Sequence, residues 1–116
     1  MQRTSSISAE VRFLDRDAVL ADLRRVVAEA KALYPEIVKV YLFGSLVDGS
    51  WTADSDADLM IVVRAQFKEF GDSCRYQIYA DSIPVDSLVY SESDFTRLAG
   101  DPESFVARNL VGAIKL

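Results

Sequence analysis

The chain has 116 residues, of which 13 are Lys or Arg and 18 are Asp or Glu, so its formal charge at neutral pH is −5. It contains no histidine and a single cysteine. The lack of histidine excludes a Ser-His-Asp or Cys-His catalytic pair and any imidazole-ligated zinc or haem site within the chain. One cysteine excludes an internal disulfide and a four-thiolate metal site. The chemistry is therefore left to carboxylates, hydroxyls, backbone amides and cations.

Length and charge restrict the class of protein further. A chain of 116 residues that is 50% hydrophobic predicts a single domain over residues 1–116 with its own core. The acidic balance argues against a nucleic-acid coat protein, but not against a small nucleotide whose charge a metal neutralises. The sequence has no apolar stretch long enough to span a membrane, and its polar start and single thiol predict a cytoplasmic protein.

The first helix is the clearest predicted element. Apolar residues recur at helical spacing after Asp15, which is a suitable N-cap, and Pro35 ends the pattern. The polar residues 1–14 that precede it are expected to form a flexible or extended arm.

Three apolar segments are predicted to be strands. Residues 37–43 and 85–90 are rich in β-branched and aromatic side chains. Residues 59–63 are almost uniformly apolar, as in a strand that is covered on both faces. We expect these segments to form a small central sheet.

Three more helices are predicted, over residues 67–78, over residues 92–98, and after Pro102. The first of these would bury Phe67, Phe70, Cys74 and Ile78, and the last would bury Phe105, Val106, Leu110, Val111 and Ile114. The order of elements predicts an α/β (α+β) fold with a small mixed central sheet flanked by helices. The last helix is apolar enough to belong to the core or to an interface between copies of the chain. The sequence is therefore compatible with both a monomer and a homo-oligomer.

Three aspartates lie on or beside the predicted strands. Asp56 and Asp58 begin the second strand and, being two residues apart, can point to one face. Asp86 lies inside the third strand, where a carboxylate is costly unless it is paired or coordinated. Close carboxylates repel each other, and Mg²⁺ prefers carboxylate oxygens. The three side chains therefore predict a two-metal site for phosphoryl transfer, although Asp-x-Asp is also common in turn chemistry.

Gly44 and Ser45 follow the first predicted strand. Glycine lets the backbone approach a phosphate closely, and the Ser45 hydroxyl is a further donor. We interpret the pair as holding one end of a triphosphate whose other end is bridged to the aspartates by metal ions. The alternative interpretation is an ordinary turn.

The segment Leu-Phe-Gly-Ser at residues 42–45, followed by ten residues and then Asp56-Ala57-Asp58, resembles the signature of the polymerase-β-like nucleotidyltransferase superfamily. The resemblance extends in element order from about Asp15 to Tyr90, and the chain is similar in size to the minimal nucleotidyltransferases (MNT type). This motif is specific for the superfamily and unspecific for the substrate.

The resemblance implies a magnesium-dependent enzyme that moves a nucleoside monophosphate, AMP from ATP, to a hydroxyl. Asp56 and Asp58 would ligate both metals, Asp86 would ligate one and help to deprotonate the acceptor, and Gly44 and Ser45 would bind the β- and γ-phosphates. Small members of the family are commonly antitoxins that modify a tyrosine of a helical HEPN-type toxin. A separate protein of that kind is the implied partner.

The chain departs from the family pattern at Asp48, where many members have an arginine that can pair with the triphosphate. An aspartate there repels the phosphates instead. Arg64, Lys68 and Arg75 either compensate or are ordinary surface charges. Trp51 in the same loop either stacks on a base or anchors the loop on the domain.

Two alternatives to a protein-modifying enzyme follow from the sequence. One is a non-catalytic binding module that keeps the fold and masks its partner. The other is a small-molecule nucleotidyltransferase of the antibiotic-modifying kind. Such enzymes usually have an additional helical domain for the acceptor, which 116 residues do not accommodate.

Overall fold

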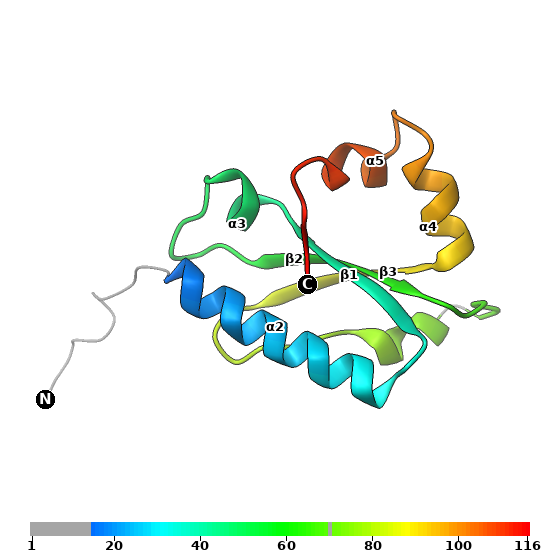
Figure 1. The fold of residues 1–116 in the computed structure, drawn as a ribbon, viewed down its shortest axis with the longest axis horizontal. Coiled ribbons are helices and arrows are strands. Elements are labelled where there is room, and N and C mark those ends of the chain that lie inside the picture. Colours follow the sequence, from blue (N-terminus) through cyan, green and yellow to red (C-terminus); the bar gives the residue numbers. More distant parts are fainter. Residues whose placement is uncertain (1–14, 70) are drawn as a thin grey trace, which may run out of the picture.

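The computed structural model describes residues 15–69 and 71–116, so the predicted arm over residues 1–14 lies outside the described residues. Four strands form one sheet in the order β3-β2-β1-β4, with helices on both faces (Figure 1). Neighbouring strands are antiparallel except for β2 and β3, which are parallel. The expected mixed sheet flanked by helices is therefore confirmed. The strands are β1 (Ile37–Phe43), β2 (Ala57–Val63), β3 (Val85–Ser91) and β4 (Ile114–Lys115).

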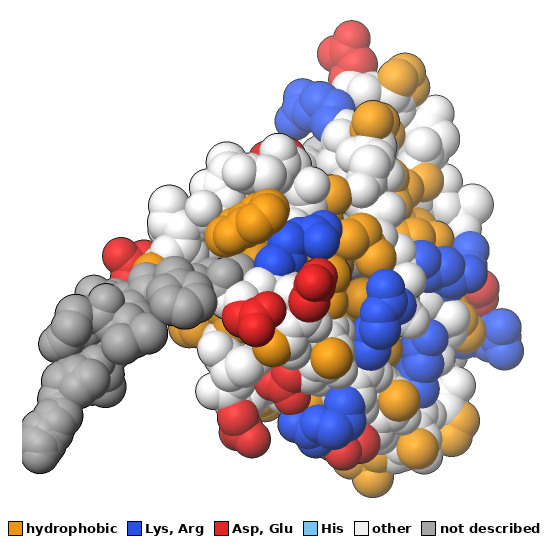
Figure 2. All heavy atoms as spheres, turned by 60° about the vertical axis from the view of Figure 1, so that its left-hand side comes forward, with side chains coloured by type: hydrophobic (Ala, Val, Ile, Leu, Met, Phe, Trp, Pro, Cys, Tyr) orange, Lys and Arg blue, Asp and Glu red, His pale blue; other side chains and the backbone are white. Residues whose placement is uncertain are grey.

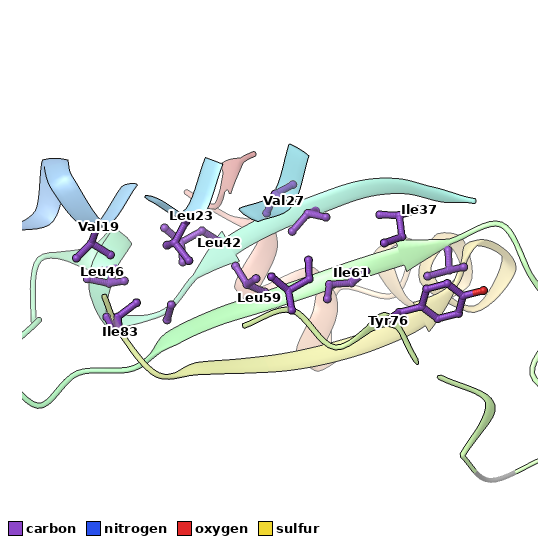
Figure 3. Packing of buried hydrophobic residues seen from close by; sticks show 14 residues of the cluster. Val19, Leu23, Val27, Ile37, Leu42, Leu46, Leu59, Ile61, Tyr76 and Ile83 are labelled. Carbon is purple, nitrogen blue, oxygen red and sulfur yellow. The ribbon is translucent and has the colours of Figure 1, made fainter. Parts of the chain in front are cut away.

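Helix α2 (Arg16–Leu33) begins and ends where the sequence predicts. The carboxylate of Asp15 accepts a hydrogen bond of 3.2 Å from the amide of Ala18, which satisfies one of the free N–H groups of the first turn. The side chains of Val19, Leu23 and Val27 lie at helical spacing and point toward the strands (Figure 3). None of the described helices is long and apolar enough to cross a membrane.

The sheet separates two hydrophobic clusters. Alternate residues of β2 point to opposite faces, so Leu59 and Ile61 pack with α2 while Met60 and Val62 pack with Phe95. The second face is covered by α4 (Glu92–Ala99) and α5 (Phe105–Leu110). Strand β2 is buried on both faces, as its uniformly apolar sequence predicts.

We expect Leu23→Ala to lower the free energy of unfolding by about 2–5 kcal/mol, because Leu23 has no exposed surface and its removal leaves a cavity. Leu33→Ala on the same helix is the control, since Leu33 is 70% exposed and should change the value by less than about 0.5 kcal/mol. Urea unfolding of the two variants measures the difference. Equal losses would contradict the placement of α2 on the sheet.

The predicted helix over residues 67–78 is wrong. Among the described residues of that segment, the one helical element is a short 3₁₀ helix, η1 (Asp72–Tyr76). Gly71 has a φ of +141°, a backbone conformation that no helix allows. The Asp72 carboxylate instead accepts hydrogen bonds from the amides of Lys68 and Glu69, which closes a turn. Cys74 is consequently exposed rather than buried. Tyr76 and Ile78 do enter the core.

The last predicted helix is correct at its start and wrong at its end. Helix α5 ends at Leu110, and Gly112, with a φ of +80°, turns the chain back toward the sheet. Ile114 then pairs with Leu42 of β1, because the edge of β1 offers unpaired backbone groups. Phe105 is 41% and Val111 is 84% exposed, so these two side chains do not face inward as predicted.

Candidate active site

Asp58 and Asp86 are brought together by the parallel pairing of β2 and β3. They are direct partners in the register, and both point to the face that α4 and α5 cover farther along the strands. Asp58 continues the row of Met60 and Val62 to the start of β2. The carboxylates therefore lie where the apolar row ends, at one end of the sheet.

Asp58 is the electrostatic centre of this group. Burial raises the pKa of its carboxyl, and the charges of Asp86 and then Asp56 raise that pKa further. Asp58 is half-buried, whereas Asp56 and Asp86 are exposed. The expectation that Asp86 is buried in an apolar strand is thus wrong, because Asp86 lies near the start of β3, beyond the part of the strand that packs in the core. Its predicted proximity to Asp58 is confirmed.

The donor set suits a divalent cation by its chemistry. Within residues 15–69 and 71–116, no three His, Cys, Asp or Glu side chains already form a group that could hold a metal ion. The negative charges of Asp86 and Asp56 nevertheless both act on the Asp58 carboxyl and raise its pKa. A hard cation bound between them would remove that repulsion, since Mg²⁺ prefers carboxylate oxygens.

Gly44 connects the end of β1 directly to this carboxylate group. Phe43 is the register partner of Asp58, and Gly44 follows it with a φ of +86° and a ψ of −150°, a conformation open only to glycine. A Cβ on Gly44 would collide with the Asp58 carboxylate oxygen and lie 3.3 Å from its Cγ. The turn is therefore packed against the carboxylate, and both the φ angle and the lack of space require glycine here.

Helix α3 (Ser45–Asp48) holds the turn in place. The amides of Val47 and Asp48 both donate to the Gly44 carbonyl at 3.0 Å. Leu46 is fully buried and lies between α2 and the segment before β3, near Val19 and Ile83 (Figure 3). In the part of the chain that the structure describes, the half-buried Ser45 hydroxyl makes no hydrogen bond, so it can donate to a ligand.

Asp48 is bound within its own loop. Its carboxylate accepts hydrogen bonds from the amide and the hydroxyl of Ser50, at 2.9 and 2.6 Å. These hydrogen bonds lower the pKa of Asp48. The acidic residue therefore stabilises the loop after α3, which gives it a structural role that the sequence did not indicate.

Trp51 anchors the loop, which supports the structural interpretation of this residue. Arg16 at the start of α2 lies with its guanidinium 5.4 Å from the centre of the Trp51 ring. Its Nε also donates to the Leu46 carbonyl at 2.7 Å. Sequence reasoning missed Arg16, because its partners are 30 and more residues away along the chain.

The three cations considered for the phosphates are not at this turn. Arg64 follows the end of β2 that is remote from Asp58, where it pairs with Glu92 at 3.4 Å. Arg75 lines a hollow with Leu33 at the end of α2, and Lys68 lies in the same exposed connection. The interpretation as surface charges holds for them. On the face shown in Figure 2, several Lys and Arg side chains gather toward the right-hand side, and most of the Asp and Glu side chains lie to their left.

A family model described as a nucleotidyltransferase domain matches residues 23–112, which include all five predicted site residues. The chain belongs to this nucleotidyltransferase family. The match begins within α2 and ends after α5, so the elements on both faces of the sheet are part of the family domain. It agrees with the MNT-type resemblance of the sequence.

Two similar proteins extend the comparison. A Methanocaldococcus jannaschii protein named "Putative protein adenylyltransferase" is 33% identical over 61 residues, which are 53% of this chain and 61% of that protein. The chain thus matches about three-fifths of the length of this relative. A crystal structure of a "putative nucleotidyltransferase" from Sulfolobus solfataricus has a TM-score of 0.56 and 23% identity, over 71% of this chain and 75% of the other. This second similarity shows a shared fold.

Proposed function

We propose that this nucleotidyltransferase moves AMP from ATP to a hydroxyl of a separate protein, in a reaction that depends on Mg²⁺. The observation that supports the proposal most is the register pairing of Asp58 with Asp86 beside the Gly44 turn. One end of the sheet thereby presents oxygen donors for a cation next to a backbone that a phosphate can approach closely. The assignment of Asp56, Asp58, Asp86, Gly44 and Ser45 to the site is part of this proposal.

The proposed reaction needs neither an imidazole nor a thiol, since carboxylates and a bound cation can supply its chemistry. The acceptor oxygen attacks the α-phosphorus, a new O–P bond forms, the bond to the bridging oxygen of the β-phosphate breaks, and pyrophosphate leaves. Asp86 is exposed and is proposed to take the proton of the acceptor hydroxyl. Ser45 would donate its hydroxyl to the phosphates. Bound Mg²⁺, held by Asp56, Asp58 and Asp86, would stabilise charge on the attacking and leaving oxygens.

A protein acceptor is supported by two considerations. The relative from Methanocaldococcus carries a name that specifies adenylyl transfer to protein. The MNT-type resemblance implies a helical HEPN-type partner with a tyrosine acceptor and hence an antitoxin role. We therefore propose such a protein as the acceptor, with ATP and Mg²⁺ as substrate and cofactor.

Calorimetry on the wild type and Asp56→Asn tests the nucleotide step. We expect ATP to bind the wild type only when Mg²⁺ is present, and Asp56→Asn to weaken this binding by about tenfold or more, because one anionic ligand of the cation is lost. Asp81→Asn, which neutralises an exposed aspartate of the loop before β3, is the matched control and should leave the affinity unchanged. Equal affinity of the wild type and Asp56→Asn would contradict the proposed metal site.

Incubation with α-labelled ATP, Mg²⁺ and a helical protein encoded next to this chain tests the transfer. We expect the label on a tyrosine of that protein. The masking alternative predicts a different pattern, in which the double variant Asp56→Asn/Asp58→Asn still neutralises the partner. Neutralisation without transfer would replace the enzymatic proposal with the binding module.

A further inference from the structure

A small cavity lies between the Gly44 turn and helix α5. Its volume is about 220 Å³, and its polar lining comes from Gly44, Asp48, Arg108 and Asn109. Whole drug-sized ligands need about 300–1,000 Å³. The cavity is therefore suited to a part of a nucleotide, and the proposed function places the phosphates beside Gly44.

Helix α5 is fixed over the end of β1. The Phe105 ring meets the Phe43 ring edge-on at 5.7 Å between centres, and Val106 is buried in the second cluster. Ser104 caps the helix by accepting from the Ala107 amide at 3.0 Å, and its hydroxyl donates to the Leu98 carbonyl. The backbone that bears Arg108 is thus held firmly against the residue that precedes Gly44.

Arg108 carries an exposed positive charge on α5. Among the described residues, no carboxylate lies within salt-bridge distance of its guanidinium, although Asp48 lines the same cavity. The carboxylate of Asp48 is bound to Ser50 instead. Arg16, on the other side of α3, is bound to the Leu46 carbonyl and Trp51. Arg108 lines this cavity and also a second hollow between α4 and α5, and its exposed charge at the edge of the cavity is available to an anion.

We propose that this cavity binds the terminal phosphates of the nucleoside triphosphate and that Arg108 is their cationic ligand. The arginine on α5 thereby compensates for Asp48 in the turn. The inference rests on the proposed function, and it adds a phosphate-binding residue outside the glycine–serine and aspartate motifs. Arginine suits this role, because its guanidinium can donate two parallel hydrogen bonds to phosphate oxygens.

Competition binding tests the proposal with three probes, Mg²⁺–ATP, Mg²⁺–tripolyphosphate and AMP. We expect Arg108→Gln to weaken binding of ATP and tripolyphosphate about tenfold or more, since a hydrogen bond to a charged group is lost. AMP binding should not change, because AMP lacks the terminal phosphates. Arg97→Gln on α4 is the matched control for the loss of one positive charge and should change none of the three affinities, since Arg97 is exposed.

Moving the positive charge across the cavity gives a second test. The double variant Asp48→Arg/Arg108→Gln should recover at least part of the lost ATP affinity, because residue 48 lines the same cavity. No recovery, together with equal effects of Arg108→Gln and Arg97→Gln, would overturn the inference. Equal loss of AMP and ATP binding in Arg108→Gln would overturn it as well.

The two proposals fail in different ways. Suppose that the wild type binds Mg²⁺–ATP, that Asp56→Asn does not bind it, and that Arg108→Gln binds it as well as the wild type does. The inference about Arg108 is then wrong and the proposed function stands. If tripolyphosphate binding depends on Arg108 while labelled ATP transfers nothing to any acceptor, the cavity is a polyphosphate site and the proposed transfer is wrong.

Discussion

Asp58→Asn is expected to lower the rate of AMP transfer at least about a hundredfold and, at neutral pH without Mg²⁺, to raise the melting temperature. The loss of activity follows from the removal of the proposed metal ligand nearest to Gly44, where transition-state charge has to be stabilised. The gain in stability follows from the relief of repulsion, since Asp86 and Asp56 both oppose the charge on Asp58. Function and stability therefore change in opposite directions.

The sign of the pH dependence follows from the raised pKa of Asp58. The folded protein holds this proton more tightly than the unfolded chain does. The destabilisation is therefore absent below the unfolded pKa of about 3.9, grows as pH rises through the folded pKa, and is constant above it. The stability of Asp58→Asn relative to the wild type should therefore increase over the same pH interval. Because Asp58 is partly exposed, solvent screening limits this increase to less than about 1 kcal/mol.

Thermal unfolding in EDTA from pH 4 to pH 8 measures this difference, with Asp81→Asn as the control for an exposed aspartate. Addition of Mg²⁺ and ATP should then stabilise the wild type and not Asp58→Asn, since a ligand stabilises only the state that binds it. A variant that is less stable than the wild type throughout would show that Asp58 is held by favourable contacts instead.

The sequence alone is sufficient to predict the helices and strands whose buried residues follow a regular apolar pattern. Helix α2 and strands β1, β2 and β3 follow from periodicity, from the Asp15 cap and from Pro35. Residues 67–78 show the limit of that reasoning, because Phe67, Cys74 and Ile78 have helical spacing although Gly71 interrupts the helix. Backbone conformation at one glycine there outweighs the side-chain pattern. Likewise, the edge of β1 recruits Ile114 from the end of the last predicted helix.

Some residues of the candidate site can be predicted from the sequence, whereas others reach the site only through tertiary packing. Gly44, Ser45, Asp56 and Asp58 are close in sequence and form a recognisable motif, and the strand order places Asp86 beside them. Arg108 carries no local signal, since its position depends on how α5 packs on Phe43. The role of Asp48 was also hidden, because its acceptance of two hydrogen bonds from Ser50 is a matter of loop geometry.

Gly44→Ala is expected to abolish detectable transfer and to destabilise the protein by about 2–4 kcal/mol. Two causes add: a φ of +86° with a ψ of −150° strains any residue that has a Cβ, and the new methyl group displaces the Asp58 carboxylate. A displacement of about 1 Å at a reacting centre already costs about a hundredfold in rate. Urea unfolding and labelled AMP transfer measure the two effects.

Gly49→Ala is the matched control, because it separates backbone strain from the collision. Gly49 has a similar φ of +90° and lies at the other end of α3, and apart from its chain neighbours no described residue has an atom within 4 Å of its Cβ position. It should cost about 1–2 kcal/mol and leave the Mg²⁺-dependent affinity for ATP near that of the wild type. If both alanine variants lost ATP binding equally, the defect would lie in the rigidity of the loop. Loss in Gly44→Ala alone would locate it at the contact with Asp58, where the end of β1 meets the carboxylates.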